Sequence, residues 1–588
     1  LDRLLFLYIF LMTILVTLIL VGDFGFFSFF QDHLNILAFG LFEDDTQAVI
    51  ESVQKNYPFK TGLALIAIFS ITLYFSFKKI FKSKLKMRFQ FKTKIISYLC
   101  FLILFAGGVR GGYGMMVLSP KYADFSKHQI INEISLNGII TFERAYKLRK
   151  SRASLDFNMA TAMGYGKNIH KAFSDYLGID VSSTRKDQLI SLIERKTPEN
   201  KLIEDLKPNV VVFVMESFGA HWIKYNNERF NFLGDLDKHF KEDILFENIL
   251  SGDNGTIGSL MVLGTNIPNR SGARFISESR YMRLPLISAA QLPYTKRGYE
   301  TSFLYGGKLS WRDIGKYFSS QGFHKIEGES HIREELNLNG KQGTEWGLYD
   351  EHLFNFIYKK LNSGTTSKFI MALSTTNHPP FEVPKNFKSK SIQIPKELEG
   401  RISREKSIFL ERFLAFQYSN QKLAEFIQKV KNSKLAQNTI IAVTGDHNFW
   451  GFMNYSSAEA FSKYKVPFYI YLPESLKPKS YDNKMIGGHE DIMTTLYNLS
   501  LSNTKFYAFG DDLLTSKTSN ALNSSVYASK FGGFYKGKSF SFVEDNSVFN
   551  SSTPKELDTL QKQYRSTLSI ADFLLRNSYK QNSKNSQN

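Results

Sequence analysis

The sequence has only one cysteine, Cys100, among its 588 residues. A disulfide needs two cysteines and a cysteine-rich metal site needs several, so the composition excludes both. A single cysteine is compatible with a reducing or an oxidising compartment and therefore does not locate the protein. The chain also lacks internal repeats, and it is too long for one ordinary domain.

Motifs for nucleic-acid binding are missing as well. The chain has neither zinc-finger spacing nor an RNA-binding signature, although 74 Lys and Arg against 55 Asp and Glu give a net charge of +19. Such an excess indicates an anionic partner, for example an anionic lipid or a phosphorylated substrate, or simply a lysine-rich proteome. Part of it lies in Phe77–Lys94, which has basic but no acidic residues. We expect no nucleic-acid partner.

Charged residues are absent from three apolar runs near the start of the sequence. Leu4–Val21 is about long enough to cross a bilayer. Gly62–Phe77 and Ile95–Gly108 are shorter, and they are either spans that need flanking residues or buried core helices. The basic run Phe77–Lys94 lies between these two and predicts a cytoplasmic loop, so the chain after about residue 110 should face outward.

The first apolar run predicts an anchor and not a cleaved signal, because it has no clear small-residue cleavage site and further spans follow it. The chain starts at Leu1 and not at Met, so we expect earlier residues, with another span or two, to precede it. These features predict a multi-pass protein of the cytoplasmic (inner) membrane. Its largest domain would lie outside the cytoplasm, in the periplasm or outside the cell.

Five segments describe the expected organisation. They are a transmembrane anchor of about three spans at 1–110, a helical connector at 111–207, an outward-facing domain at 208–515, its C-terminal extension of short strands at 516–575 and a disordered tail at 576–588.

From residue 209 onward, short apolar segments alternate with amphipathic ones. One of the latter, Ser407–Val430, carries its apolar residues near helical spacing. Strands that alternate with helices predict an α/β domain, in which helices cover both faces of a parallel sheet. The expected strands are Val210–Met215, Thr301–Leu304, Phe369–Leu373, Thr439–Val443 and Pro467–Leu472.

Residues with useful chemistry stand where the expected strands end. Glu216 directly follows the first strand, Asp446 and His447 follow "NTIIAVTG", and His378 comes shortly after "KFIMALS". Thr256 lies between a glycine-rich loop and an apolar run, at a predicted helix N-terminus, where backbone N–H groups favour phosphate or sulfate oxygens. In parallel sheets the carboxyl ends of the strands usually form the site.

These side chains together could hold one divalent ion. Carboxylates, imidazole and hydroxyl groups are ligands for such ions. A bound ion lowers the pKa of a hydroxyl and screens an anionic group from its attacker. Each residue alone has an ordinary explanation as a helix cap or a turn residue, but their shared position at strand ends indicates a common site.

The motifs "VMESFG", "GDNGTIGSL", "NHPPF" and "TGDHN", in this order, resemble those of the lipoteichoic acid synthase and phosphoglycerol transferase family. That family belongs to the sulfatase/alkaline phosphatase superfamily, and the resemblance runs from the anchor to about Leu501. It implies an alkaline phosphatase/sulfatase-like α/β fold, with a mixed, mostly parallel sheet and helices on both faces, preceded by an α-helical transmembrane anchor. In this family an outward-facing domain moves phosphoglycerol from a lipid to a glycan or a growing polymer.

The resemblance also implies roles for individual residues. Glu216, Thr256, Asp446 and His447 would bind one Mn²⁺ or Mg²⁺, with Zn²⁺ as a further option. Thr256 would in addition be the nucleophile that forms a phosphothreonine intermediate. His378 would face the same phosphate as an acid or an orienting donor.

The segment "YGGKLSWRDIGKYF" resembles the family segment whose Trp and Arg bind glycerol phosphate. Trp311 and Arg312 are therefore substrate-binding candidates, since an arginine can donate two parallel hydrogen bonds to a phosphate. Here the two residues are adjacent, whereas the family pattern has a residue between them. Otherwise Trp311 would be a core residue, and Arg312 would form a surface salt bridge.

The segment "GGHEDIMTTLYNL" resembles the "H-x-D-x-x-P-T" segment that is common in sulfatases, with Thr494 in place of the proline. His489 would then be a ligand of a second metal, as in two-zinc relatives. Alternatively, it supports or caps the site from behind the ligands of the first metal.

We expect a phosphoglycerol transferase with an anionic phospholipid donor and a glycan or polyol-phosphate acceptor; its basic residues would attract anionic headgroups. A phosphoethanolamine transferase shares this chemistry but usually has many cysteines. A sulfatase needs a "C/S-x-P-x-R" pattern, which does not occur around Thr256. A sulfuric or phosphoric ester hydrolase of the superfamily is a further alternative. An inactive membrane scaffold would have lost a ligand, but all four are present. The acceptor and the identity of the metal stay open.

Overall fold

The computed structural model describes residues 2–30, 33–34, 59–82, 91–111, 134–143, 146 and 158–585, the last range without 280, 310, 450, 518–519 and 545. The chain forms two compact units. The first consists of residues 1–42 and 49–148, and the main part of the second is 149–588. The expected connector, 111–207, is thus divided between the two units, since its residues from 149 onward belong to the second.

The first unit contains three long apolar helices: α1 (Asp2–Phe30), α4 (Phe59–Lys82) and α5 (Phe91–Arg110). All three are long and apolar enough to cross a membrane. Flanking residues extend the two shorter apolar runs to helices of 24 and 20 residues. At most 6% of each apolar window is buried, which contradicts the alternative that these runs are core helices.

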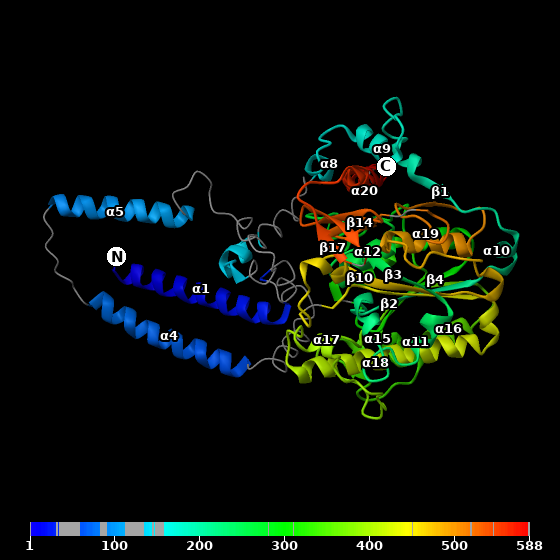
Figure 1. The fold of residues 1–588 in the computed structure, drawn as a ribbon, viewed down its shortest axis with the longest axis horizontal. Coiled ribbons are helices and arrows are strands. Elements are labelled where there is room, and N and C mark those ends of the chain that lie inside the picture. The colour runs from blue at the N-terminus through cyan, green and yellow to red at the C-terminus, as the bar shows by residue number, and fades with distance from the viewer. Residues whose placement is uncertain are drawn as a thin grey trace. The chain divides into compact units, whose positions relative to one another are not determined.

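The second unit is built on an eight-stranded sheet with the order β11-β3-β10-β9-β2-β8-β4-β5 (Figure 1). Five neighbouring strands, β9, β2, β8, β4 and β5, run parallel to one another. Strand β10 runs antiparallel to both of its neighbours, β3 and β9. The predicted mixed, mostly parallel sheet is therefore confirmed. The strands are β2 (Asn209–Met215), β3 (Ile244–Leu250), β4 (Glu300–Tyr305), β5 (Lys325–Glu327), β8 (Lys368–Leu373), β9 (Thr439–Gly445), β10 (Lys465–Tyr471) and β11 (Gly487–Gly488).

All five expected strands are present, and β3, β5 and β11 are additional. β5 and β11 have only three and two residues, too few for a recognisable pattern. In β3, "ILFENIL", a glutamate and an asparagine interrupt the apolar residues. This strand pairs with β10 and β11 and is less completely buried than β2.

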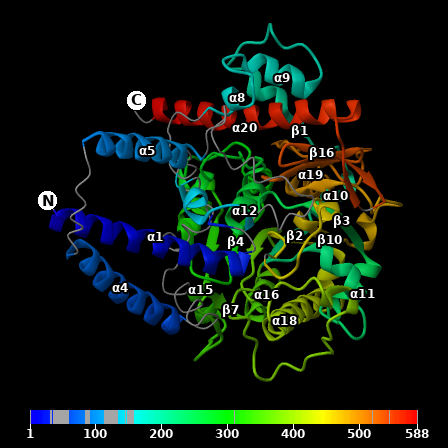
Figure 2. The ribbon, with the colours of Figure 1, turned by 60° about the vertical axis from the view of Figure 1, so that its left-hand side comes forward.

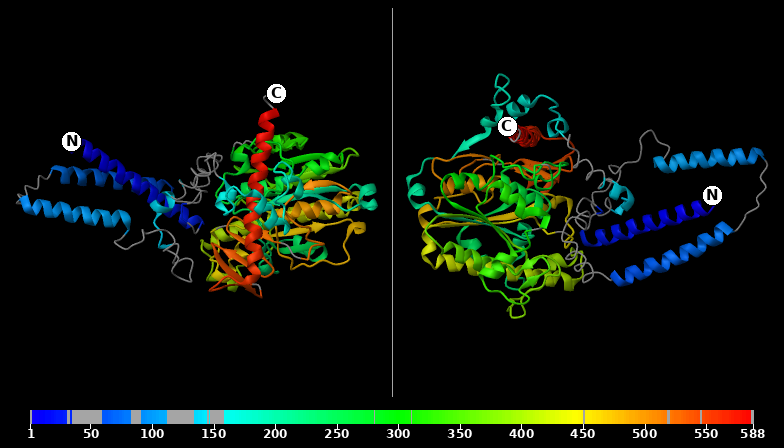
Figure 3. Two further views of the ribbon diagram at one scale, coloured as in Figure 1. Left: turned by 90° about the horizontal axis from the view of Figure 1, so that it is seen from above. Right: turned by 180° about the vertical axis from the view of Figure 1, so that it is seen from behind.

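Helices cover both faces of the sheet (Figures 2 and 3). Neighbouring residues of β2, such as Val212 and Phe213, belong to two separate hydrophobic cores. Burial on both faces explains why β2 is apolar from Val210 to Met215 and does not alternate. The helices of one core include α12 (Thr256–Thr265) and α19 (His489–Ser500), and those of the other include α16 (Asp350–Leu361) and α18 (Lys406–Lys431), the latter predicted as Ser407–Val430.

Shorter elements complete the second unit. The helices are α8 (Met159–Ala162), α9 (Ile169–Leu177), α10 (Lys201–Leu206), α11 (Leu236–Glu242), α13 (Leu292–Lys296), α14 (Ile314–Gln321), α15 (Glu329–Glu335) and α17 (Lys396–Glu399). Two small sheets pair β1 (Glu194–Lys196) with β12 (Lys505–Tyr507) and β6 (Gly343–Thr344) with β7 (Gly347–Leu348).

The C-terminal region contains the expected short strands and one helix that was not expected. The strands form an antiparallel sheet of β13 (Ala521–Leu522), β14 (Val526–Ser529), β15 (Gly532–Tyr535), β16 (Lys538–Val543) and β17 (Asn546–Phe549). Helix α20 (Asp558–Asn585) then packs against α8 and α9. It includes most of 576–588, so the expectation of a disordered tail is wrong as far as Asn585. The preceding turns of α20 pack into the hydrophobic core through residues such as Leu574 and Leu575. The polar residues that follow continue this packed helix.

A buried ion pair joins α20 to the rest of the second unit. Asp572 is 2% exposed; it pairs with Arg270 and Arg576 and also accepts a hydrogen bond from the backbone N–H of Met159. We expect Asp572→Ala to lower the free energy of unfolding by about 3–5 kcal/mol, because it leaves the Arg270 charge buried without its partner. Chemical denaturation measures this loss.

The matched control is Asp187→Ala, which removes an exposed ion pair with Arg185. It should change the free energy of unfolding by less than about 1 kcal/mol. Equal effects of the two substitutions would contradict a structural role for the buried pair.

Candidate metal centre

The sheet register places the two carboxylates side by side. Strands β2 and β9 are adjacent and parallel, and Met215 pairs with Gly445 at their carboxyl ends. The next residues, Glu216 and Asp446, therefore leave the sheet at the same edge and the same level. The backbone N–H of Asp446 donates to the carbonyl of Met215 at 3.0 Å, which extends the strand pairing to this point.

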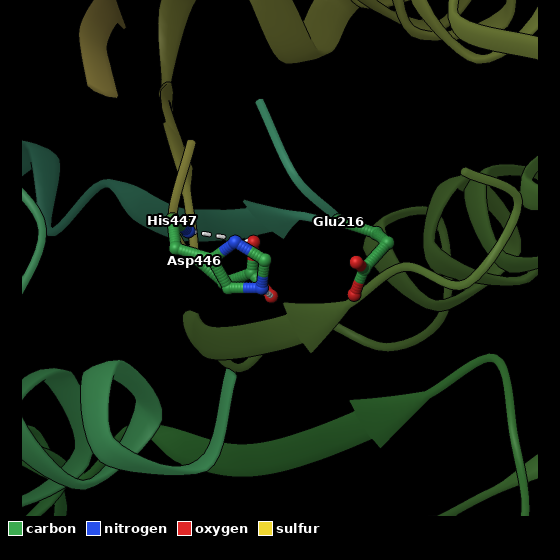
Figure 4. A group of neighbouring side chains, drawn as sticks. All are labelled: Glu216, Asp446 and His447. Atoms are coloured by element: carbon green, nitrogen blue, oxygen red, sulfur yellow. Dashed lines mark hydrogen bonds and ion pairs between the residues drawn. The ribbon is translucent and has the colours of Figure 1, made fainter. Parts of the chain in front are cut away.

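Glu216, Asp446 and His447 form a buried group that could hold a metal ion (Figure 4). One ligand atom from each lies within 4.8 Å of the others. Two atoms bound to one ion at about 2.1 Å can lie up to about 4.2 Å apart, so the group needs only a slight contraction to share an ion. Two carboxylates and an imidazole suit Mn²⁺, Mg²⁺ or Zn²⁺.

Hydrogen bonds hold the Asp446 carboxylate in place. Its Oδ1 accepts the backbone N–H groups of Ser217 and His447, each at 2.7 Å. Its Oδ2 accepts the hydroxyl of Thr256 at 2.6 Å. Ser217 has a positive φ of 56°, an uncommon conformation for a residue other than glycine, and this turn directs its N–H at Asp446.

The tautomer of His447 follows from its neighbour. Its Nδ1 lies 2.7 Å from the carbonyl oxygen of Asn448, so Nδ1 carries the proton and donates it. Nε2 then keeps a lone pair, and it lies 3.5 Å from Asp446 Oδ2. Such an arrangement is typical of a metal-binding histidine, whose other nitrogen is fixed by a backbone carbonyl.

The electrostatics of the group also favour a cation. Burial, together with the neighbouring Glu216, raises the pKa of Asp446 to about 7. For Glu216, burial favours the neutral form, but the facing His378 outweighs it and lowers the pKa of Glu216. Two buried carboxylates repel each other, and a divalent ion between them would remove that repulsion. The donor set thus fits a divalent ion in both its chemistry and its charge.

Thr256 lies where the sequence predicts it, as the first residue of α12 and after Gly255. The hydrogen bond from its hydroxyl to Asp446 brings it to the three ligand candidates. All four predicted residues of the first metal therefore meet at one point, although 230 residues separate Glu216 from Asp446. Their roles as ligands and nucleophile stay predictions.

His378 belongs to the same site. Its Nε2 lies 3.2 Å from Glu216 Oε2. Burial alone would lower the pKa of His378, but the facing carboxylate outweighs it and raises that pKa. The indole of Trp346 stacks on the imidazole, with ring centroids 4.1 Å apart and planes 9° apart. The loop just before His378 is held by Asp350, whose Oδ1 accepts the backbone N–H groups of Thr375 and Thr376.

Trp311 and Arg312 follow the carboxyl end of β4, at the same edge of the sheet. Arg312 pairs with Glu278, and its guanidinium lies 5.7 Å from the ring of Trp311. Trp311 packs against the core and Tyr305. Arg312 thus engages Glu278 and Trp311, and the substrate-binding role of Trp311 and Arg312 stays a prediction.

His489 is buried at the start of α19 and uses both ring nitrogens. Nδ1 accepts the backbone N–H of Gly252 at 3.1 Å, and Nε2 faces the carbonyl of Gly445 at 3.0 Å. Burial lowers its pKa to about 3. His489 therefore ties the loop before Thr256 to the end of β9. These contacts favour a supporting role over that of a ligand for a second metal.

Three residues of the site, Ser217, Trp346 and Arg412, were not expected from the sequence. Ser217 stands in the quoted motif "VMESFG", and its position next to Glu216 was a usable signal. Trp346 lies in a short hairpin and Arg412 in the second turn of α18, far from any motif. Their proximity to the centre depends on tertiary packing, which no local pattern records.

Parts of the chain are similar in sequence to known proteins. Residues 208–500 match the family model described as Sulfatase. Over 62% of this chain the sequence is 24% identical to lipoteichoic acid synthase 1 of Bacillus subtilis (strain 168), and the match covers 57% of that protein. Over 27% of this chain it is 25% identical to phosphoglycerol transferase I of Citrobacter koseri, covering 20% of that protein. The chain thus spans about half, or less, of these curated relatives.

The fold is shared with solved structures. The crystal structure of the lipoteichoic acid synthase LtaP from Listeria monocytogenes superposes with a TM-score of 0.52 and 19% identity, covering 64% of this chain and 98% of that chain. At this level of identity the likeness establishes the fold alone. It agrees with the eight-stranded sheet and its two helical layers.

Proposed function

Residues 208–500 form a sulfatase-family domain, and from this premise we propose that the protein is a membrane-anchored, metal-dependent phosphoglycerol transferase. It would move glycerol phosphate from a phosphatidylglycerol-type lipid to a glycan or polymer acceptor. The observation that carries the proposal is the contact of Thr256 with the buried group Glu216, Asp446 and His447. The names of the curated relatives support the choice of phosphoglycerol.

The metal would be Mn²⁺ or Mg²⁺, with Zn²⁺ as a further option. Glu216 and Asp446 would bind it through carboxylate oxygens, His447 through Nε2 and Thr256 through its hydroxyl. When bound, such an ion would lower the pKa of the hydroxyl and screen the charge of the phosphate. The resting hydrogen bond to Asp446 keeps the Thr256 oxygen at the centre.

In the first step the Thr256 hydroxyl gives up its proton to solvent, and its oxygen attacks the donor phosphorus. The new bond joins Oγ1 to phosphorus, and the bond from phosphorus to the diacylglycerol oxygen breaks. His378 would donate the proton that the leaving oxygen takes up, because its imidazole can carry a proton and its Nε2 lies at the centre, 3.2 Å from Glu216 Oε2. The product is a glycerol phosphate ester of Thr256.

In the second step an acceptor hydroxyl attacks the phosphorus, and the bond to Oγ1 breaks. The neutral His378 would accept the proton of the attacking hydroxyl, and the Thr256 oxygen takes up a proton from solvent. Attack by water instead would release glycerol phosphate, which is the hydrolytic side reaction. A phosphoric ester hydrolase therefore differs from the transferase only in the second step, where water attacks the phosphorus in place of an acceptor hydroxyl.

The three apolar helices suit this function, because the donor is a membrane lipid. We propose that they cross the cytoplasmic membrane and that the second unit lies outside the cytoplasm. The basic segment Phe77–Lys94 would lie on the cytoplasmic side. The remaining basic excess would help to attract anionic headgroups.

A transfer assay with the full chain in lipid bilayers tests the proposed donor. Phosphatidylglycerol with a labelled headgroup should yield diacylglycerol and label in a glycan or in glycerol phosphate, whereas labelled phosphatidylethanolamine should not react. Equal or greater reaction with phosphatidylethanolamine would replace the proposal by a phosphoethanolamine transferase. Release of sulfate from a sulfate ester, without any lipid reaction, would replace it by a sulfatase.

His378→Gln should lower kcat about 10²–10³-fold and leave Mn²⁺ affinity nearly unchanged. Glutamine keeps a polar side chain beside Glu216 but cannot donate a proton to the leaving group. The rate of diacylglycerol release measures the effect. His352→Gln changes a buried histidine of α16 that lies outside the metal-ligand group; it is the matched control and should keep near wild-type kcat. A wild-type rate for His378→Gln would refute the acid role.

A further inference from the structure

Arg412 is a buried arginine of α18 without an ordinary partner. The residue is 5% exposed. Its Nε finds no hydrogen-bond acceptor, and no carboxylate within the described part of the chain forms an ion pair with it. Burial lowers its pKa to about 9. A buried charge in this state is costly, so its presence calls for a role.

Aromatic rings hold the guanidinium beside the metal centre. Its carbon lies 4.3 Å from the ring centroid of Phe449, 4.6 Å from that of Phe452 and 5.0 Å from that of Phe381. Phe449 follows His447 by two residues, and Phe381 follows His378 by three. Arg412 is therefore fixed between the two loops that carry the histidines of the site.

The charge of Arg412 also acts on the site directly. The carboxylates Glu216 and Asp446 act to raise the pKa of Arg412, against the effect of burial. The positive charge of Arg412 in turn acts to lower the pKa of His378. These effects occur although no direct hydrogen bond links Arg412 to either carboxylate.

A charge count suggests what Arg412 is for. One divalent ion balances the two carboxylates, Glu216 and Asp446. The positive charge of Arg412, and that of His378 when it holds the proton of the proposed first step, then have no counterpart in the loaded site. A phosphodiester carries one negative charge, so a bound phosphatidylglycerol headgroup would supply a counterion to these cations. Arginine is also the cation best shaped to donate two hydrogen bonds to a phosphate.

We propose that Arg412 binds the phosphate of the donor lipid and of the phosphothreonine ester at the metal centre. This inference rests on the proposed function and adds a phosphate-binding residue to it. The phenylalanine rings keep the guanidinium in place before the substrate arrives, so little side-chain entropy is lost when it binds.

Binding measurements on the full chain, loaded with Mn²⁺, test the inference. The probes are glycerol phosphate and inorganic phosphate, titrated calorimetrically in parallel with Mn²⁺. Arg412→Met should raise the Kd of both phosphates about 10–100-fold, the size expected for a charge-assisted contact, while the Kd of Mn²⁺ stays the same or falls. Arg412→Lys should recover part of the phosphate affinity.

Arg404→Met is the matched control. Arg404 also faces Phe452, at 6.0 Å, but its Nε donates to the carbonyl of Gly451 at 3.1 Å. This variant should bind both phosphates as the wild type does. Thermal unfolding of each variant shows whether the fold is retained.

Three outcomes separate the possibilities. Selective loss of phosphate binding in Arg412→Met supports the inference. If this loss is seen but phosphatidylglycerol gives no transfer, the inference stands and only the proposed function fails. Unchanged phosphate binding overturns the inference, even if transfer from phosphatidylglycerol continues. Equal losses of phosphate and Mn²⁺ affinity, with a lower unfolding temperature, also overturn it, because Arg412 would then only support the fold.

Discussion

Replacing Thr256 by alanine is expected to lower transfer from phosphatidylglycerol by roughly 10⁴-fold or more, because no covalent ester can then form. The side chain contributes one hydrogen bond to the described structure, to Asp446 Oδ2, and its loss should leave the fold intact. Transfer of the headgroup label and release of diacylglycerol measure the rate. Circular dichroism and thermal unfolding establish that the variant is folded.

Two further variants complete this test. Thr256→Ser keeps a hydroxyl at the same place and should retain part of the activity. Thr265→Ala, at the opposite end of α12, removes a buried hydroxyl that donates to the carbonyl of Met261, and it should keep the wild-type rate. If Thr256→Ala still transferred label at a similar rate, another residue would be the nucleophile.

Replacing Asp446 by asparagine is expected to raise the Kd of Mn²⁺ by at least about 100-fold and to lower transfer in proportion. The amide oxygen can still accept the N–H groups of Ser217 and His447. The amide nitrogen, however, would replace the oxygen that faces Thr256, so the metal loses both a charge and a ligand. Isothermal calorimetry with Mn²⁺ measures the change.

The metal-free variant should be at least as stable as the metal-free wild type. The substitution removes one of two buried carboxylates that repel each other; burial and this repulsion together raise the pKa of Asp446. Asp512→Asn changes a buried aspartate outside the ligand group and serves as the control, with wild-type Mn²⁺ affinity. Tight Mn²⁺ binding by Asp446→Asn would contradict the proposed coordination.

The sequence predicts the centre of the sheet well for a physical reason. Strands such as β2 and β9 are buried on both faces, so they are short runs of apolar residues that no solvent-facing residue interrupts. Their polar ends are then conspicuous, and Glu216 and Asp446 stand directly after them. Parallel neighbours bring such ends together, which is why residues 230 positions apart could be assigned to one site.

Other features depend on contacts that the sequence does not display. Arg412 lies in an amphipathic helix, where a charged residue is ordinarily assigned to the solvent-facing side, yet it points to a buried cluster of rings. Trp346 reaches His378 only through the fold of a short hairpin. The C-terminal tail has a composition typical of disorder, and its helix is continued from apolar turns packed on α9.

Peptide mapping by mass spectrometry after incubation with Mn²⁺ and phosphatidylglycerol tests the central claim most directly. The account predicts one glycerol phosphate on the peptide that contains Thr256, seen in the wild type, absent from Thr256→Ala and strongly reduced in Asp446→Asn. A modification on a different residue, or diacylglycerol release by the wild type with no covalent ester at any time point, would contradict it.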